Sequence, residues 1–222
     1  MQICPSILEP TAESLVKTIN KLSPYYNYFQ IDIADGIYVA NKTVQIDEII
    51  NFLSSYPLPP TTYHLTFDFH LMVKDYETEI KKLERLRNLI NIKNIFIHFS
   101  VFPKPYPLIP NPSFNIGLTL NPQDQVADLA GRYALDTIPC LQIMSVVPGV
   151  QGNPFLPETL IKIEQLRVLG YKSKIFLDGA VNAKTIPVIN KLKYKPDVIC
   201  PGSFLAKAID LEKNVDYLNK LT

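Results

Sequence analysis

The segment Gln30-Ile-Asp-Ile-Ala-Asp-Gly36 decides the fold, because it is an apolar strand that ends in carboxylates and a turn glycine. The same pattern returns in Asp68-Phe-His-Leu-Met-Val73 and in Phe176-Leu-Asp-Gly-Ala180. In parallel α/β barrels, polar side chains at the C-terminal ends of the strands form the active site. The three segments therefore predict a barrel whose mouth brings together Asp32, His70 and Asp178.

Strand-like and helix-like patterns alternate along the chain, which indicates βαβ units and a parallel sheet. Short β-branched or aromatic runs predict eight strands, at 2–8, 28–33, 64–72, 94–99, 114–120, 137–146, 173–178 and 197–200. Amphipathic patterns predict helices at 11–22, 46–54, 75–90, 157–169, 183–192 and 203–221. Thr11 is placed to cap the first of these helices. The alternation predicts one (β/α)8 TIM barrel domain over residues 1–222.

One unit departs from this pattern, between the fourth and fifth strands. Residues 101–113 contain the prolines Pro103, Pro105, Pro107, Pro110 and Pro112. A proline inside a helix costs about 3 kcal/mol, so this segment cannot form an ordinary helix. We expect an extended crossover of the polyproline II type in place of the fourth helix. The alternative is a disordered linker between two domains. The strand pattern that resumes at Phe114 argues against this alternative.

Composition and charge indicate a globular protein of the cell interior. The 222 residues are 47% hydrophobic, which suffices for a large core, and the net charge of +1 without a basic run argues against a nucleic-acid partner. No apolar stretch approaches the ~20 residues needed to cross a bilayer, and no charged-then-apolar leader opens the chain. The cysteines lie in apolar runs and are expected to be buried thiols: Cys4, Cys140 and Cys200. We therefore expect a cytoplasmic protein without membrane partners.

Asp32 and Asp178 are the candidate catalytic residues. A carboxylate at the end of an apolar strand costs several kcal/mol to bury unless it is paired or bound to a metal. Two carboxylates across a barrel mouth can act as acid and base on opposite faces of one carbon, which suits removal of a proton α to a carbonyl and its return to the other face. For either residue taken alone, a helix cap or a turn aspartate is the alternative.

His70 is the candidate metal ligand among the three histidines. A lone histidine in an apolar strand is usually a structural residue. Together with the two carboxylates, however, it completes an N/O site that suits Zn²⁺, Fe²⁺ or Mn²⁺. His98 ends the next strand and either lines the mouth or only finishes that strand, and His64 has no predicted role.

Glycine turns after the last two strands predict a phosphate site. Asp178-Gly-Ala180 and Pro201-Gly-Ser203 each precede a helical pattern. Small residues at such turns let backbone N–H groups approach an anion, and the loops after strands seven and eight commonly bind phosphate in this barrel class. Gly149-Val-Gln-Gly152, after the sixth strand, could form a third wall or a lid.

Nearly the whole chain resembles the ribulose-phosphate 3-epimerase family. The motifs that carry the resemblance are, in chain order, Cys4-Pro-Ser-Ile-Leu8, Ile31-Asp-Ile-Ala-Asp-Gly-Ile-Tyr-Val-Ala-Asn41, His70-Leu-Met-Val73, Asn121-Pro122, Met144-Ser-Val-Val-Pro-Gly149, Asp178-Gly179 and Gly202-Ser203. So many ordered motifs in a chain of this length are more specific than any one of them.

The resemblance implies a divalent-metal epimerase of the pentose phosphate pathway that interconverts D-ribulose 5-phosphate and D-xylulose 5-phosphate at C3. It implies that Asp32 and Asp178 face the two sides of C3. It also implies that one metal ion, held by these carboxylates and His70, stabilises a cis-enediolate as a Lewis acid. The further contacts that it implies with the substrate or its phosphate are Ser6, Met72, Met144, Gly149, Gly152, Gly179, Ala180, Gly202 and Ser203.

Several positions depart from the family pattern. Gln30 stands where the family has a histidine ligand, and its amide oxygen would bind a metal more weakly than imidazole does. The occupancy of the site by Zn, Fe, Mn or Co therefore stays open. Ala34 replaces a methionine of the apolar cap, and Ala180 replaces a glycine. Ser100 replaces the glutamate that the family usually has two positions after the strand-four histidine.

These departures leave three functions open. The first is the pentulose-phosphate epimerase. The second is an epimerase or isomerase of another ketose phosphate such as allulose 6-phosphate, and the third is a catalytically inactive barrel that binds sugar phosphates or a protein partner. All of the enzymatic readings predict a small phosphorylated ketose as the substrate, and the sequence leaves open whether the chain forms a homo-oligomer.

Overall fold

The computed structural model describes residues 1–56, 64–102 and 113–220. The predicted proline-rich crossover lies almost entirely outside these residues. What is described of that connection begins with a short 3-10 helix, η2 (Phe99–Val101), directly after a strand.

One parallel sheet forms the centre of the molecule, with the strand order β1-β9-β8-β7-β6-β5-β4-β3-β2. Its strands are β1 (Gln2–Ile3), β2 (Ser6–Ile7), β3 (Tyr28–Ala34), β4 (Thr66–Met72), β5 (Asn91–His98), β6 (Asn115–Leu120), β7 (Cys140–Met144), β8 (Lys174–Asp178) and β9 (Val198–Cys200). All eight predicted strands are confirmed, the first of them as the two short pieces β1 and β2.

The first extended segment closes the sheet into a barrel. β1 pairs with β9 and β2 pairs with β3, so the two ends of the strand order belong to one stretch of chain. Across the break, the Cys4 N–H donates to the Ile199 carbonyl at 3.0 Å, and the Gln30 N–H donates to the Pro5 carbonyl at 2.9 Å. The predicted (β/α)8 barrel is therefore confirmed, with its N-terminal segment as the joint.

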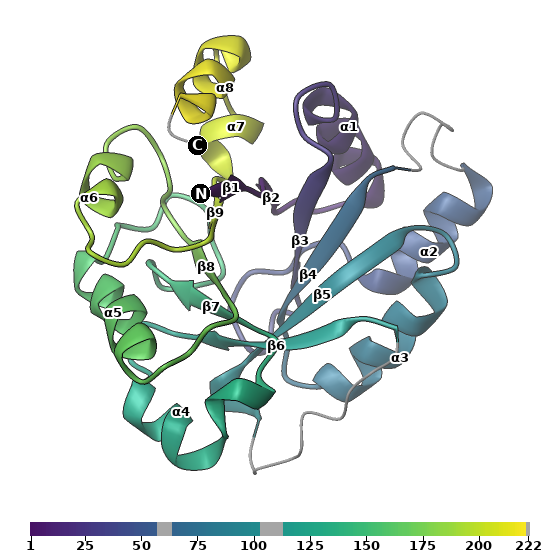
Figure 1. The fold of residues 1–222 in the computed structure, drawn as a ribbon. Helices are drawn as coiled ribbons and strands as arrows, with labels where there is room; N and C mark the ends of the chain where they lie inside the picture. The colour runs from purple at the N-terminus through teal and green to yellow at the C-terminus, as the bar shows by residue number, and fades with distance from the viewer. Residues whose placement is uncertain (57–63, 103–112, 221–222) are drawn as a thin grey trace.

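Helices surround the strands on the outside of the barrel (Figure 1). They are α1 (Ala12–Leu22), α2 (Ile46–Ser55), α3 (Tyr76–Leu86), α4 (Val126–Arg132), α5 (Ile161–Val168), α6 (Ile186–Asn190), α7 (Ser203–Ala206) and α8 (Leu211–Asn219), with the short 3-10 helices η3 (Leu135–Thr137) and η4 (Pro157–Leu160). Thr11 caps α1 as predicted, because its side chain accepts a hydrogen bond from the Ser14 N–H. None of the helices in the described ranges is long and apolar enough to cross a membrane.

The observed helices differ from the predicted ones in two places. The sequence pattern did not predict α4, which is seven residues long and buries only Val126 and Leu129, too few to show a helical period. The helix predicted over 203–221 is instead two helices, α7 and α8. The predicted helix is interrupted at Asp210. Its side chain accepts a hydrogen bond from the Lys213 N–H, and Asp210 is therefore the N-cap at which α8 begins.

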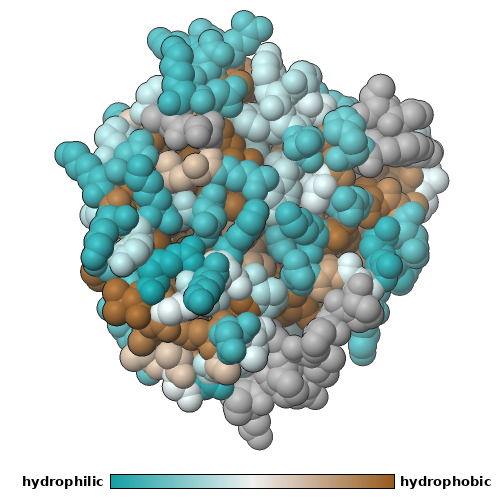
Figure 2. Space-filling view, viewed as in Figure 1, coloured by the Kyte–Doolittle hydropathy of each residue, from teal (hydrophilic) through white to brown (hydrophobic). Residues whose placement is uncertain are grey.

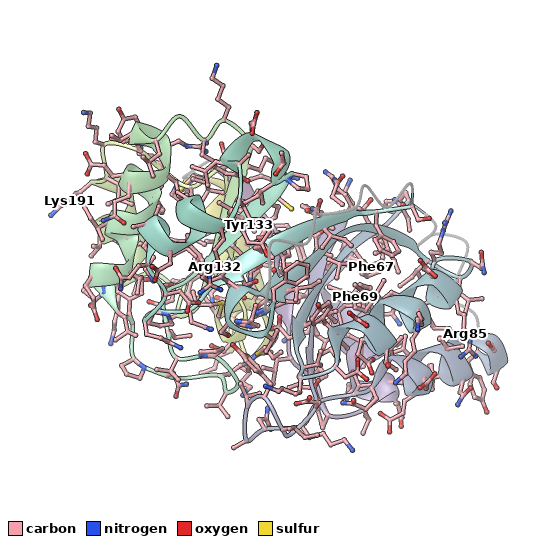
Figure 3. All side chains as sticks on the ribbon, turned by 90° about the horizontal axis from the view of Figure 1, so that it is seen from below. Phe67, Phe69, Arg85, Arg132, Tyr133 and Lys191 are labelled. Carbon is pink, nitrogen blue, oxygen red and sulfur yellow. The ribbon has the colours of Figure 1, made fainter. Side chains whose placement is uncertain are left out.

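Side chains of each strand alternate between two cores. On β4, Phe67 and Phe69 belong to the large core between strands and helices, where Figure 3 shows them on the helix side of the strand. The intervening side chains face the barrel interior, where the rings of Phe96 and Phe176 meet with centroids 4.8 Å apart. All three cysteines are buried free thiols in this interior cluster, as predicted. Figure 2 shows hydrophilic residues over much of the face that it presents, with smaller hydrophobic areas between them.

We expect Gly117→Ala to lower the free energy of unfolding by about 3 kcal/mol, because the barrel interior is already full there. An added Cβ would lie 2.6 Å from the Cys140 carbonyl oxygen and 3.1 Å from a ring carbon of Phe96. Gly131→Ala is the control, since a Cβ at this exposed position of α4 meets no atom within 4 Å. It should raise stability by about 0.5–1 kcal/mol. Equal effects of the two changes in urea unfolding would contradict this packing.

A buried carboxyl lies at the opposite end of the interior from the barrel mouth. Asp68 is fully buried, and it accepts hydrogen bonds from the Tyr28 hydroxyl and from the backbone and side-chain N–H groups of Asn94, the last two at 3.0 and 2.9 Å. Burial raises the pKa of Asp68 to about 6, although these hydrogen bonds oppose the shift. In the folded protein Asp68 therefore binds its proton more tightly than in the unfolded chain.

This proton linkage predicts a pH-dependent difference between the wild-type protein and Asp68→Asn. Unfolded Asp68 loses its proton near pH 4, whereas folded Asp68 keeps it up to about pH 6, so rising pH favours the unfolded wild-type chain over this interval. The unfolding free energy of the wild-type protein, relative to that of the variant, should fall by about 3 kcal/mol from pH 4 to pH 6 and stay level above pH 7. A pH-independent difference in urea titrations would show that the Asp68 pKa is not raised.

Candidate active site

The predicted site residues come from the C-terminal ends of strands that meet at one mouth. Asp32 on β3 and His70 on β4 are register partners, and Asp178 is the last residue of β8. All three side chains are buried in the barrel interior. The parallel register therefore brings residues far apart in sequence to the same level of the barrel, as the three opening segments of the sequence predicted.

These three side chains form a compact donor set. His70 Nδ1 lies 3.1 Å from Asp32 Oδ1 and 3.7 Å from Asp178 Oδ2. One ligand atom from each residue lies within 4.8 Å of the other two, which is the spacing of atoms around a single ion. One imidazole and two carboxylates suit a divalent cation such as Zn²⁺, Fe²⁺ or Mn²⁺, so these residues fit the metal that the sequence predicts.

Gln30 lies between the two carboxylates, with its amide nitrogen toward them. Nε2 donates to Asp32 Oδ1 at 3.0 Å and to Asp178 Oδ2 at 2.8 Å. The amide oxygen accepts from the Cys200 thiol, with Sγ at 3.7 Å. In this arrangement Gln30 is a hydrogen-bond donor that bridges the acidic pair, and the ligand role predicted for its oxygen would require the amide to turn over.

Gln142 on β7 is a site residue that the sequence pattern missed. Its Nε2 donates to Asp178 Oδ2 at 3.2 Å and approaches Met144 Sδ at 3.6 Å. Its Oε1 is buried without a hydrogen-bond partner among the described residues. A signal was present in the sequence, because a polar residue at the centre of the apolar run Cys140–Met144 needs a polar partner inside the barrel.

The surroundings of Asp178 change its proton affinity. Burial raises the pKa of Asp178, and the negative charge of Asp32 raises it further, while His70 and the Gln30 amide oppose the shift. Two acidic groups this close cannot both be ionised at little cost. The raised pKa of Asp178 suits it to carry a proton as a general acid.

A cavity of about 180 Å³ opens above this pair. Besides the three donor residues, its lining includes every predicted substrate contact, namely Ser6, Met72, Met144, Gly149, Gly152, Gly179, Ala180, Gly202 and Ser203. The structure thus gathers all of the predicted site residues except Gln30 on one cavity wall, and Gln30 lies beneath them. No lysine or arginine is among the described residues that line it.

The turn after β8 has a backbone that only small residues tolerate. Gly179 has a φ of 110°, and a Cβ there would lie 2.9 Å from the backbone nitrogen of Val146. Ala180 follows with a φ of 49°, in the left-handed region where glycine is favoured. The alanine at a family glycine position is therefore accommodated in a glycine-like conformation, so this departure preserves the turn.

The fold defines a class of protein, the parallel (β/α)8 barrel enzymes, and here the polar side chains Asp32, His70 and Asp178 gather at the C-terminal mouth of the barrel. Within that class, residues 2–205 match the model of the Ribulose-phosphate 3 epimerase family. The chain belongs to this family and is thereby an isomerase of the carbohydrate epimerase type.

Curated relatives support the assignment over nearly full length. The chain is 28% identical to ribulose-phosphate 3-epimerase of Helicobacter pylori (strain ATCC 700392 / 26695) over 231 residues, which cover 100% of this chain and 98% of the relative. It is 26% identical to the enzyme of that name from Escherichia coli (strain K12), covering 96% of this chain and 92% of the relative.

Solved structures with similar folds are TIM-barrel enzymes. The 3-hexulose-6-phosphate synthase of Salmonella typhimurium matches with a TM-score of 0.58 and 12% identity, over 100% of this chain and 98% of that chain. The tryptophan synthase A-subunit of Pyrococcus furiosus matches with a TM-score of 0.60 and 14% identity, over 99% and 97%. At these identities the likeness concerns the fold alone.

Proposed function

We propose that the chain interconverts D-ribulose 5-phosphate and D-xylulose 5-phosphate by moving a proton at C3. The observation that carries the proposal is the pair Asp32 and Asp178, buried at the floor of one cavity on either side of His70. Epimerisation next to a carbonyl needs both an acid and a base at once, and this pair supplies them.

Each residue of the pair has one role in a given direction. Asp32 removes the proton from C3, and the electron pair of the broken C–H bond moves toward the carbonyl to give an enediolate. Asp178 then delivers its own proton to the opposite face of C3. The pair ends with its protonation reversed, which is the starting state for the reverse reaction. A divalent cation held by Asp32, His70 and Asp178 would supply Lewis-acid stabilisation of the enediolate charge.

The rest of the cavity wall suits a phosphorylated ketose. Met72 and Met144 are buried beside the donor set and exclude water from the reacting carbon. The turns at Gly179 and Gly202 line the cavity, and their backbone N–H groups would hold the phosphate. Because no lysine or arginine of the described lining assists them, phosphate binding would depend on these amides.

The test is proton NMR of ribulose 5-phosphate that has been incubated in D₂O with the protein. The protein is supplied in turn with Zn²⁺, Fe²⁺, Mn²⁺ or Co²⁺, and the metal is chelated before each spectrum is recorded. The expected result is deuterium at C3 together with formation of xylulose 5-phosphate. The proposal fails if no exchange occurs with any of the four metals. Binding of the sugar phosphate without exchange would indicate the inactive barrel instead.

The identity of the ketose needs a second comparison. The ratio kcat/KM should be higher for ribulose 5-phosphate than for allulose 6-phosphate. If kcat/KM were instead ten times higher for the hexulose phosphate, the proposed mechanism would stand but the proposed substrate would be wrong.

A further inference from the structure

Two polar side chains converge on one glycine at the mouth of the barrel. Gly202 lies in the turn after β9 and lines the cavity, as does Ser6. A Cβ added at Gly202 would lie 2.9 Å from Ser6 Oγ and 3.5 Å from Gln151 Nε2. Glycine at position 202 therefore leaves room between two hydrogen-bonding groups, where any larger residue would displace them.

The side-chain N–H groups of Gln151 are free to bind a ligand. Within the described ranges, they donate to no protein acceptor. Neighbouring amides of the cavity wall are already engaged. Asn153 Nδ2 donates to the Val147 carbonyl at 2.6 Å, and Asn182 Nδ2 donates to the Ala180 carbonyl at 2.7 Å. Gln151 is half-buried, so its N–H groups gain free energy when an acceptor takes the place of partial solvation.

The loop that carries Gln151 is held in place by a second loop, the one after β3. Asn41 Nδ2 donates to the Gly149 carbonyl at 2.8 Å. Val39 packs so closely on Gly149 that a Cβ there would lie 2.8 Å from the Val39 Cβ. Gly149 and Gly152 have φ values of 113° and 98°, which side chains rarely adopt, so this turn is specified by its glycines. The contacts order the backbone beside Gln151 before a ligand arrives, which lowers the entropy cost of binding.

The chemistry of the cavity selects the ligand. Val150 and Gly152, on either side of Gln151, line it together with Gly202 and Ser203. Because no lysine or arginine belongs to the described lining, an anion in this cavity has only neutral donors to bind it. A hydrogen bond from a neutral N–H to an ionised oxygen is about twice as strong as one between neutral groups, so a free amide here favours an anionic ligand.

We propose that the Gln151 side chain binds the phosphate of the substrate, with Nε2 as the donor, beside the space that Gly202 leaves next to Ser6. The inference rests on the phosphorylated substrate of the proposed function and adds a side-chain donor to the backbone amides of Gly179 and Gly202. It does not depend on the proton transfer at C3.

Binding of inorganic phosphate to the full chain is the first test, followed by ³¹P NMR titration without metal or sugar. Gln151→Leu removes both N–H donors at a similar side-chain size, so phosphate affinity should fall about tenfold, the effect of losing one hydrogen bond to a charged group. Gln151→Lys places a positive charge at the same position and should raise the affinity about tenfold. Gln165 lies at an exposed position of α5 and gives the matched control, because Gln165→Leu and Gln165→Lys should leave phosphate affinity unaltered.

The opposite directions of the two effects separate a phosphate contact from a structural role. If Gln151 only supported the fold of its loop, both substitutions would weaken phosphate binding. Wild-type affinity in Gln151→Leu, or weakened binding in Gln151→Lys, would therefore overturn the inference. Absence of phosphate binding by the wild-type protein would overturn it too.

The KM for ribulose 5-phosphate separates this inference from the proposed function. It should rise about tenfold in Gln151→Leu, because the phosphate of the sugar loses the same hydrogen bond. C3 exchange with an unaltered KM in this variant would overturn the inference and leave the proposed function standing. Phosphate affinities in the expected order without C3 exchange by the wild-type protein would support the role of Gln151 and contradict only the proposed function.

Discussion

Asp178→Asn should lower kcat for C3 epimerisation by about 10³-fold, the range of effects seen when a general acid or base is lost. Asparagine has nearly the same shape as aspartate and can still accept hydrogen bonds from amide donors, although more weakly. Its side chain has no acidic proton to transfer. Because each direction of the reaction needs both carboxyl groups, Asp32→Asn should lose a similar factor. A coupled assay of xylulose 5-phosphate formation measures both variants.

The control for this pair is Asp216→Asn, an identical chemical change at an exposed position of α8 that should leave kcat unaltered. Zinc content is measured for each variant, so that loss of a ligand can be separated from loss of a proton carrier. If Asp178→Asn retained more than a tenth of the wild-type kcat with zinc bound, the acid role assigned to Asp178 would be wrong.

Gln30→His should raise zinc affinity by about 100-fold. Structural zinc sites gain about 10–16 kcal/mol from four ligands, so one added imidazole is worth about 3 kcal/mol. The wild-type amide presents its nitrogen to Asp32 and Asp178, which gives a cation three protein ligands and no contribution from position 30. An imidazole there could replace that donor with a metal-binding nitrogen.

Gln30→Met is the matched control, since methionine has a similar length but neither a donor nor an oxygen. It should show no gain in zinc affinity, and it loses the hydrogen bonds that hold the acidic pair together. If chelator competition gave the same affinity for Gln30→His and the wild-type protein, the side chain at position 30 would not reach the ion.

Strand periodicity was enough to predict the barrel and the meeting of Asp32, His70 and Asp178. Side chains two apart on a strand share a face, and parallel strands in register carry those faces to one level. The helix α4 escaped prediction because a seven-residue helix with two buried positions has no measurable period. The break between α7 and α8 depends on one capping side chain, Asp210, inside a pattern that otherwise continues.

The orientations of polar groups could not be predicted from local sequence. Which end of the Gln30 amide faces the carboxylates depends on Asp178, 148 positions later, and on the thiol of Cys200. The role of Gln142 likewise exists only once β7 and β8 pair and bring it to Asp178. Hydrogen bonds of this kind are set by tertiary contacts, whereas propensity and periodicity describe neighbours along the chain.

The joint between β1, β2 and the rest of the sheet has a consequence for the order of events during synthesis. Residues 2 and 3 pair with 198 and 199, so the ring of strands cannot shut until the ribosome has made β9. Until then β2 can pair with β3, but the C-terminal side of the growing sheet presents an open edge that another nascent chain could extend. The last strand to emerge therefore ends the interval in which the protein is most exposed to misassembly.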